Sequence, residues 1–227
     1  MQEAVNSAYN IALFYLIIYY LFIVYRKDII MKKIALYFTN QIIKIDNEAE
    51  ADREIYLYAF ESIFTKIFIY ILLCIIGIAT KTFFSVGLTI VYIVLLRGQT
   101  SGFHANTPYV CTLLSITTCL GCVFISLNVV FSKNHYIILF LLIISVLYIL
   151  HTSPINHKAL DLTPYEKEIM HKKTGRILFI ELLFISLFYI SSSLRSFSLC
   201  GSLSIIAVAF YMLLAKLLNQ EVKVEKE

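Results

Sequence analysis

Long apolar runs, separated by short clusters of charged residues, dominate the sequence. Seven runs approach the length of about 20 residues that a helix needs to cross about 30 Å of hydrocarbon. They are apolar on all sides, which favours helices over the short alternating strands of a β-barrel. The pattern predicts an all-α, multi-pass transmembrane helical bundle. The runs are Ala8 to Tyr25, Ile63 to Ala79, Thr82 to Leu96, Tyr109 to Val130, Tyr136 to Leu150, Ile177 to Leu194 and Ser198 to Leu218.

Composition points to the same class of protein. Of the 227 residues, 59% are hydrophobic and only 15% are charged, whereas a soluble domain usually carries about 25% charged residues. Tyrosine is abundant and tryptophan is absent, so tyrosine is expected to supply the interfacial aromatic belt. The lipid bilayer is therefore an expected partner. Nucleic-acid binding is not expected, because the sequence offers no basic soluble face.

The first apolar run has two interpretations. No small-residue cleavage site of a signal peptide follows it, because Arg26-Lys27-Asp28 come next. It is either an extra span or sequence upstream of a start at Met31, and we favour the second. The expected organisation is a hydrophobic extension (1–30), a membrane domain of about six spans (31–218) and a polar C-terminal tail (219–227). From Ile34 to Ile45, apolar residues follow the spacing of an interfacial amphipathic helix.

Positive charges are distributed unequally between the two sides that alternating spans would create. From Met31 onward, one side holds 14 Lys or Arg residues and the other holds three, namely Lys81, Lys133 and Arg195. Cytoplasmic loops of membrane proteins carry the excess of Lys and Arg. Both termini and the segments 97–108 and 151–176 are therefore expected to face the cytosol.

The segment between the second and third of these six spans carries the candidate chemistry. It runs from Arg97 through Gly102 and His104 to Cys111. Thr107 is a candidate N-cap and Pro108 a candidate first helical residue, so Cys111 would lie in the opening turn of a helix. Unpaired N–H groups at a helix N-terminus favour the thiolate form of cysteine. His104 is positioned in sequence to serve as the general base that a cysteine nucleophile needs.

Each of these residues also has an ordinary interpretation. A single cysteine in a membrane helix is most often a small buried packing residue, and a single loop histidine is most often an interfacial side chain. The catalytic interpretation depends on four residue types that converge on one short cytosolic segment: Arg97, Gly102, His104 and Cys111.

The same segment resembles the accessory gene regulator B family of membrane peptidases in bacterial peptide quorum sensing. That family has an Arg, then a Gly-Gly-Tyr-His-Ala-like run, then a Cys seven residues after the His. Here these are Arg97, Ser101-Gly102-Phe103-His104-Ala105 and Cys111. Ser101 replaces the first Gly, so a backbone geometry restricted to glycine is in question. Phe103 replaces Tyr and lacks its hydroxyl. A looser likeness extends from about Met31 to Leu218.

The resemblance implies a cysteine endopeptidase in the bacterial cytoplasmic membrane, with its active site facing the cytosol. Its substrate would be a short autoinducer precursor peptide (accessory gene regulator D-like), which it would cut and help to cyclise. By this likeness Cys111 is the nucleophile and His104 the acid and base, while Arg97 and Gly102 match positions needed for activity. We expect Arg97 to orient a carboxylate or backbone group and Gly102 to allow a close approach. The family further implies a homodimer and needs no metal or organic cofactor.

Other polar residues have competing interpretations. Cys119 and Cys122 form a single C-x-x-C, for which packing is favoured over a redox or zinc role. Glu181 is expected to extend toward the cytosolic end of its span. Five basic residues of the segment 151–176 are expected either to set topology or to bind the precursor's acidic tail: Lys158, Lys167, Lys172, Lys173 and Arg176. The alternative functions are a small multi-pass transporter and a non-catalytic membrane scaffold.

Overall fold

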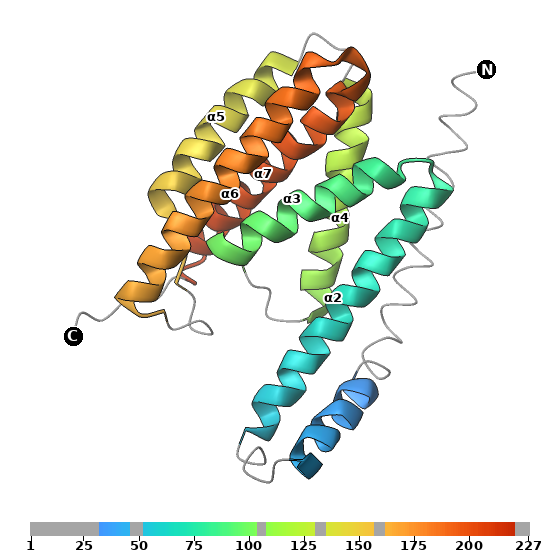
Figure 1. Cartoon of the computed structure of the whole chain (residues 1–227), viewed down its shortest axis with the longest axis vertical. Coiled ribbons are helices and arrows are strands. Elements are labelled where there is room, and N and C mark those ends of the chain that lie inside the picture. The colour runs from blue at the N-terminus through green and yellow to red at the C-terminus, as the bar shows by residue number, and fades with distance from the viewer. Residues whose placement is uncertain (1–31, 46–51, 104–107, 130–134, 157–161, 221–227) are drawn as a thin grey trace. The chain divides into compact units, whose positions relative to one another are not determined.

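We describe the chain from a computed structural model, which covers residues 32–45, 52–103, 108–129, 135–156 and 162–220. All regular elements within these ranges are helices (Figure 1). The chain divides into two compact units, residues 1–69 and 70–227, and each is described by itself. The expected apolar run from Ala8 to Tyr25 lies outside the described residues.

The first unit contains a helix over residues 32–45 and the beginning of α2 (Arg53–Ala79). The Phe38 ring packs against Phe60 and Phe64, with ring centroids 5.8 and 5.2 Å away. Ala35 and Thr39 are buried, while the Ile45 side chain is 87% exposed. The helix predicted before the first span is therefore present, and one face of it packs while the other stays open. Exposed apolar side chains on such a helix suit the lipid–water interface.

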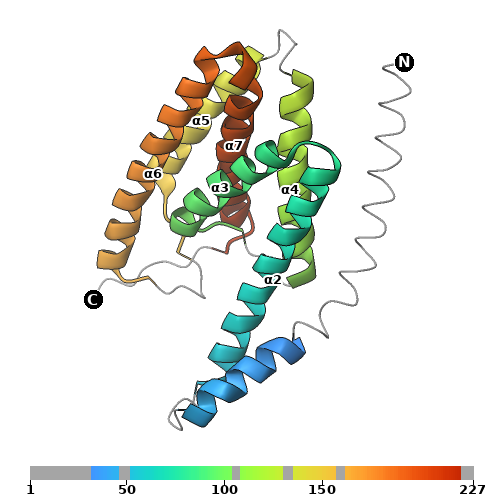
Figure 2. The same ribbon diagram turned by 45° about the vertical axis from the view of Figure 1, so that its right-hand side comes forward.

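The second unit is built around its last helix. In chain order it contains α3 (Phe83–Thr100), α4 (Pro108–Val129), α5 (His135–Thr152), α6 (Pro164–Ile190), the short 3-10 helix η2 (Ser192–Leu194) and α7 (Arg195–Leu217). Helix α7 packs against α3, α4, α5 and α6 (Figure 2). A Cβ atom at Gly201 would lie 2.8 Å from Ile185 Cγ1 and 3.0 Å from Tyr92 Cζ. Glycine there lets α3, α6 and α7 approach closely, as small residues do between membrane helices.

The helices present much apolar surface to their surroundings. Ile137, Phe140, Leu147 and Phe179 are all more than half exposed, which suits lipid rather than water. Within the described residues, four helices are long and apolar enough to cross a membrane: Arg53–Ala79, Phe83–Thr100, Val110–Asn128 and Ser192–Leu217. Tyr136–Thr152 is apolar but shorter. The chain is therefore an all-α integral membrane protein, and the expected count of six spans is approximate.

Three helices extend well beyond the predicted apolar runs. Helix α2 begins at Arg53 and not at Ile63. Helix α3 continues to Thr100, so Arg97 lies in its last turn and not in a loop. Helix α6 begins at Pro164, so half of the predicted loop 151–176 is helical. In all three places segments that contain polar residues continue the helix past the apolar run. The boundaries predicted there were wrong because hydropathy marks contact with lipid and not the end of a helix.

Candidate active site

The C-terminal end of α3 is tied to the segment that follows it through Arg97. Its guanidinium donates a hydrogen bond from Nη2 to the Phe103 carbonyl oxygen at 2.7 Å. The same guanidinium lies over the ring of Tyr211 on α7, with its central carbon 5.0 Å from the ring centroid. Charged donors make stronger hydrogen bonds than neutral ones, and a cation over an aromatic face is attracted by the ring. Arg97 therefore fixes the backbone immediately before His104.

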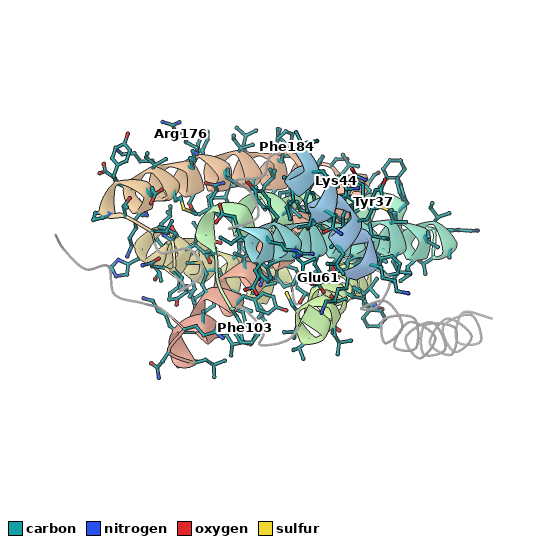
Figure 3. All side chains as sticks on the ribbon, turned by 90° about the horizontal axis from the view of Figure 1, so that it is seen from below. Tyr37, Lys44, Glu61, Phe103, Arg176 and Phe184 are labelled. Atoms are coloured by element: carbon teal, nitrogen blue, oxygen red, sulfur yellow. The ribbon has the colours of Figure 1, made fainter. Side chains whose placement is uncertain are left out.

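The backbone of residues 101–103 turns sharply against α7. Ser101 has φ 57° and ψ −148°, and Gly102 has φ 141°. The Ser101 amide caps α3 by donating to the Arg97 carbonyl at 3.1 Å, and the Phe103 amide donates to the Tyr211 carbonyl at 3.1 Å. Phe103 thus lies beside α7 (Figure 3). Both positive φ values fall in the region that favours glycine, so the turn stops α3 and redirects the chain.

Tyr211 also reaches α4, the helix that carries Cys111. Its hydroxyl is hydrogen-bonded to the Thr118 hydroxyl and lies 3.4 Å from the Leu114 carbonyl oxygen. Positions 111, 114 and 118 are three and four residues apart, so they lie along one face of the helix. One side chain of α7 therefore contacts both Arg97 and the cysteine-bearing face of α4.

A second set of contacts holds the end of α3 from the side of α5 and α6. The Ile155 amide donates to the Thr100 carbonyl at 3.0 Å. His171 Nδ1 donates to the Ser153 carbonyl at 2.8 Å, because a carbonyl oxygen can only accept. Together with the contacts of Tyr211, these hydrogen bonds join the C-terminal ends of α3, α5 and α7 to the first halves of α4 and α6.

Cys111 lies in the opening turn of α4, which begins at Pro108 as the sequence predicts. It is a free, half-buried thiol, and its backbone carbonyl accepts a 2.9 Å hydrogen bond from the Ser115 hydroxyl. Its predicted partner His104 lies outside the described residues. The described geometry therefore covers both sides of the histidine, from Arg97 to Phe103 and from Pro108 onward.

The predicted basic cluster lies mainly on the first half of α6. Lys172, Lys173 and Arg176 are exposed, and Arg176 points away from the other helices (Figure 3). Lys172 Nζ lies 2.6 Å from Glu168 Oε1, one helical turn earlier. This hydrogen bond and the lysine charge lower the pKa of the Glu168 carboxyl. Lys167 is half-buried, and Lys158 lies outside the described residues.

Helix α6 begins with a capping box. Thr163 Oγ1 accepts from the Glu166 amide at 3.3 Å, and Glu166 Oε2 accepts from the Thr163 amide at 2.9 Å. The hydrogen bond from the Thr163 amide, followed by the one that the Thr163 hydroxyl donates to Glu166 Oε2 at 2.8 Å, lowers the pKa of the Glu166 carboxyl. The reciprocal pair satisfies backbone donors that would otherwise be unpaired, and it fixes where the basic part of α6 starts.

Two further predictions concern residues inside the bundle. Cys119 and Cys122 are 2% and 6% exposed, as expected for packing residues. Glu181 is 2% exposed, and neither carboxyl oxygen has a hydrogen-bond partner within the described structure. The expectation that Glu181 extends toward the membrane surface was wrong, because it lies on the face of α6 that packs inward with Leu178 and Ile185. Among the described residues, no three His, Cys, Asp or Glu side chains are grouped to hold a metal ion.

Comparison with known proteins adds one finding to this geometry. The family model for accessory gene regulator B matches residues 31–213. The match includes Arg97, Gly102, His104, Cys111 and Tyr211. Searches of curated proteins and of solved structures give no match.

Proposed function

Because the chain belongs to the accessory gene regulator B family, we propose that it is a membrane cysteine endopeptidase that cuts a short quorum-sensing precursor peptide. The family places it among the membrane proteins of autoinducer peptide processing. The observation that carries the more specific proposal is the convergence of Arg97, the 101–103 turn and the Cys111 helix on Tyr211. This arrangement holds the chain on both sides of His104.

In the proposed reaction, His104 takes the proton of the Cys111 thiol, and the sulfur attacks the scissile carbonyl carbon of the precursor. The carbon–sulfur bond forms, the carbon–nitrogen bond breaks, and His104 returns the proton to the leaving amine. A thiol or hydroxyl within the precursor then attacks the thioester, closing a thiolactone or lactone ring. Its proton passes to the departing Cys111 sulfur, which restores the free thiol.

The supporting residues have structural roles in this scheme. Arg97 holds the Phe103 carbonyl, one peptide unit before His104, and Gly102 permits the positive φ that directs this segment along α7. A small misplacement of a reacting group can lower a rate by about 100-fold. The requirement for Arg97 and Gly102 then reflects the position of His104 and not direct chemistry by either residue.

The end of the second unit that carries Arg97 and Cys111 is proposed to lie on the cytosolic side of a bacterial cytoplasmic membrane. The precursor is made in the cytosol. The proposal rests on the unequal Lys and Arg distribution. A cysteine introduced at the exposed Lys173 position, in a background without accessible thiols, should resist a membrane-impermeant maleimide until the cells are opened. Labelling in intact cells would show that the orientation is the opposite of the one proposed. Membership of the family also suggests a homodimer, which chemical cross-linking in the membrane would detect.

The exposed basic residues of α6 are proposed to hold the acidic C-terminal part of the precursor. Lys173 and Arg176 can offer charge at the membrane surface, whereas Lys172 is paired with Glu168. Exposed charge attraction is weakened by salt. Neutralising Lys173 and Arg176 together should raise KM at low salt and have less effect at high salt. An unchanged KM at both salt concentrations would reject precursor binding and would mean that these charges serve only to set the membrane topology.

Co-expression with a candidate precursor, a short peptide sought among the neighbouring genes, tests the proposed function. Cleavage should be lost in Cys111→Ala and kept in Cys119→Ala, the matched control for loss of a cysteine from α4. A transporter or scaffold would tolerate both substitutions. Equal amounts of each variant in the membrane must be established first, so that lost cleavage reports chemistry and not insertion.

A further inference from the structure

We propose that Tyr211 is a positioning residue of the active site, which fixes the relative positions of Arg97, the 101–103 turn and α4. The inference rests on the proposed peptidase function and adds a residue outside the sequence motif to it. Tyr211 is 8% exposed, close to the end of α7. Three different parts of this one residue make contacts with three different segments.

The backbone of Tyr211 contacts the turn before His104. Its carbonyl accepts the Phe103 amide hydrogen at 3.1 Å. A Cβ atom added to Gly102 would lie 3.6 Å from the Tyr211 carbonyl carbon and from the Met212 nitrogen. The turn therefore packs directly against the α7 backbone, so a shift of α7 along its axis would shift this turn with it.

The ring of Tyr211 contacts the guanidinium of Arg97. The 5.0 Å separation from the ring centroid is within the range in which a cation is attracted to an aromatic face. The ring therefore restrains the guanidinium while Nη2 binds the Phe103 carbonyl. Phe103 is held at both its amide and its carbonyl, by α7 directly and by α3 through Arg97.

The hydroxyl of Tyr211 contacts α4. Thr118 is its hydrogen-bond partner, and the Leu114 carbonyl oxygen lies 3.4 Å away. Thr118 is seven residues beyond Cys111, which corresponds to about 10 Å along the helix axis on the same face. The hydroxyl therefore restrains the rotation of α4 about its axis and its translation along that axis. These two restraints fix the position of the Cys111 thiol relative to the turn before His104.

A tyrosine that only fills the core would need none of these polar contacts. Phe140, near the start of α5, is 63% exposed and provides an aromatic control position away from the site. Tyr211→Phe keeps the ring under Arg97 and removes the hydroxyl. Tyr211→Leu removes both, and Thr118→Val removes only the partner on α4.

The experiment measures kcat and KM for precursor cleavage by the full chain in membranes, per inserted molecule. Tyr211→Leu should lower kcat by about 100-fold with little change in KM, because misplacement affects the reacting groups more than binding. Tyr211→Phe should recover most of that loss but keep a measurable decrease in kcat, of up to about 10-fold relative to the unchanged chain. Thr118→Val should resemble Tyr211→Phe, and combining the two should be no worse than either alone. Phe140→Leu should leave kcat unchanged.

Normal kcat in Tyr211→Leu would overturn the proposal, as would equal losses in Tyr211→Leu and Phe140→Leu. If Tyr211→Leu does not insert, Tyr211→Phe and Thr118→Val decide: additive losses or no loss in both would overturn it. Cys111→Ala, measured in parallel, separates this outcome from failure of the proposed function. Cleavage that persists in Cys111→Ala would reject the peptidase itself, whereas cleavage lost there but normal in Tyr211→Leu would reject only the positioning role.

Discussion

Arg97 donates a 2.7 Å hydrogen bond to the carbonyl oxygen of Phe103, the residue that immediately precedes His104. This bond links the last turn of α3 to the turn that leads into the candidate catalytic histidine. The guanidinium makes it while lying over the Tyr211 ring. Position 97 thus requires a side chain that is both a flat, delocalised cation and a directed N–H donor.

Substitution of Arg97 tests this double requirement. Lysine keeps the charge but is a point charge that cannot stack and bind in the same geometry. We expect Arg97→Lys to lower kcat by roughly 10- to 100-fold, and Arg97→Gln to lower it further. Initial cleavage rates at saturating precursor would measure both. Full activity in Arg97→Lys would mean that charge alone suffices and that the Phe103 contact is not used.

The backbone of the turn makes opposite predictions for two neighbouring residues. Ser101 adopts φ 57° and ψ −148°, a conformation that costs a non-glycine residue about 1–3 kcal/mol. Ser101→Gly should therefore raise thermal stability, while Gly102→Ala should lower it because φ is 141°. The added methyl group has room, with 3.6 Å to α7, so the loss would be conformational. Thermal unfolding in detergent would measure both; stabilisation by Gly102→Ala would contradict the described turn.

Burial of Glu181 predicts a stabilising substitution. Both of its carboxyl oxygens lack hydrogen-bond partners in the described part of the chain, and burying an unpaired polar group costs about 1–3 kcal/mol. Glu181→Leu should raise the unfolding temperature and leave cleavage intact, with Glu181→Gln in between. Ile185→Val, one turn away, is the packing control. Loss of cleavage in both Glu181 variants, without loss of stability, would instead assign this carboxyl a functional role.

The capping box predicts how the start of α6 responds to acid. The hydrogen bonds from Thr163 stabilise ionised Glu166, so its folded-state pKa lies below the ordinary 4.5. The stabilisation is present above that ordinary value and is lost as the pH falls through the lowered pKa. The amides of residues 163 and 165–168 should therefore lose hydrogen-exchange protection, after correction for intrinsic rates, between pH 6 and strongly acidic pH. Glu166→Gln should remove this pH dependence; an unchanged dependence would assign it to another group.

The extent to which the sequence predicted this architecture differs between elements. The apolar runs located α4, α5 and α7 and the end of α2 to within a few residues, because lipid contact requires apolar side chains. The start of α2 lies at Arg53, before the predicted Ile63. Helix α3 continued through Arg97, Gly98 and Gln99 to Thr100, where the positive φ of Ser101 ends it. The start of α6 carried a signal that was missed, since Thr163, Pro164 and Glu166 form a capping box with proline at N1.

The candidate site was only partly visible in the sequence. Arg97, Gly102, His104 and Cys111 fall within 15 residues and could be found as a motif. Tyr211 could not, because a tyrosine near the end of an apolar run resembles any interfacial aromatic residue. Its importance depends on helix packing, which brings a residue of α7 against α3 and α4. A residue that positions others from a distant part of the chain belongs to no local sequence motif by which it could be recognised.

The central claim is that Cys111 forms a covalent thioester with the precursor. The direct measurement is intact-mass and peptide-mass analysis of the chain after co-expression with the neighbouring precursor, in which the ring-closing residue is replaced by alanine. Cyclisation is then blocked, so the acyl-enzyme should accumulate. The account predicts the precursor's N-terminal fragment on Cys111, released by hydroxylamine, absent in Cys111→Ala and retained in Cys119→Ala. Continued cleavage in Cys111→Ala, or an adduct on another residue, would contradict it.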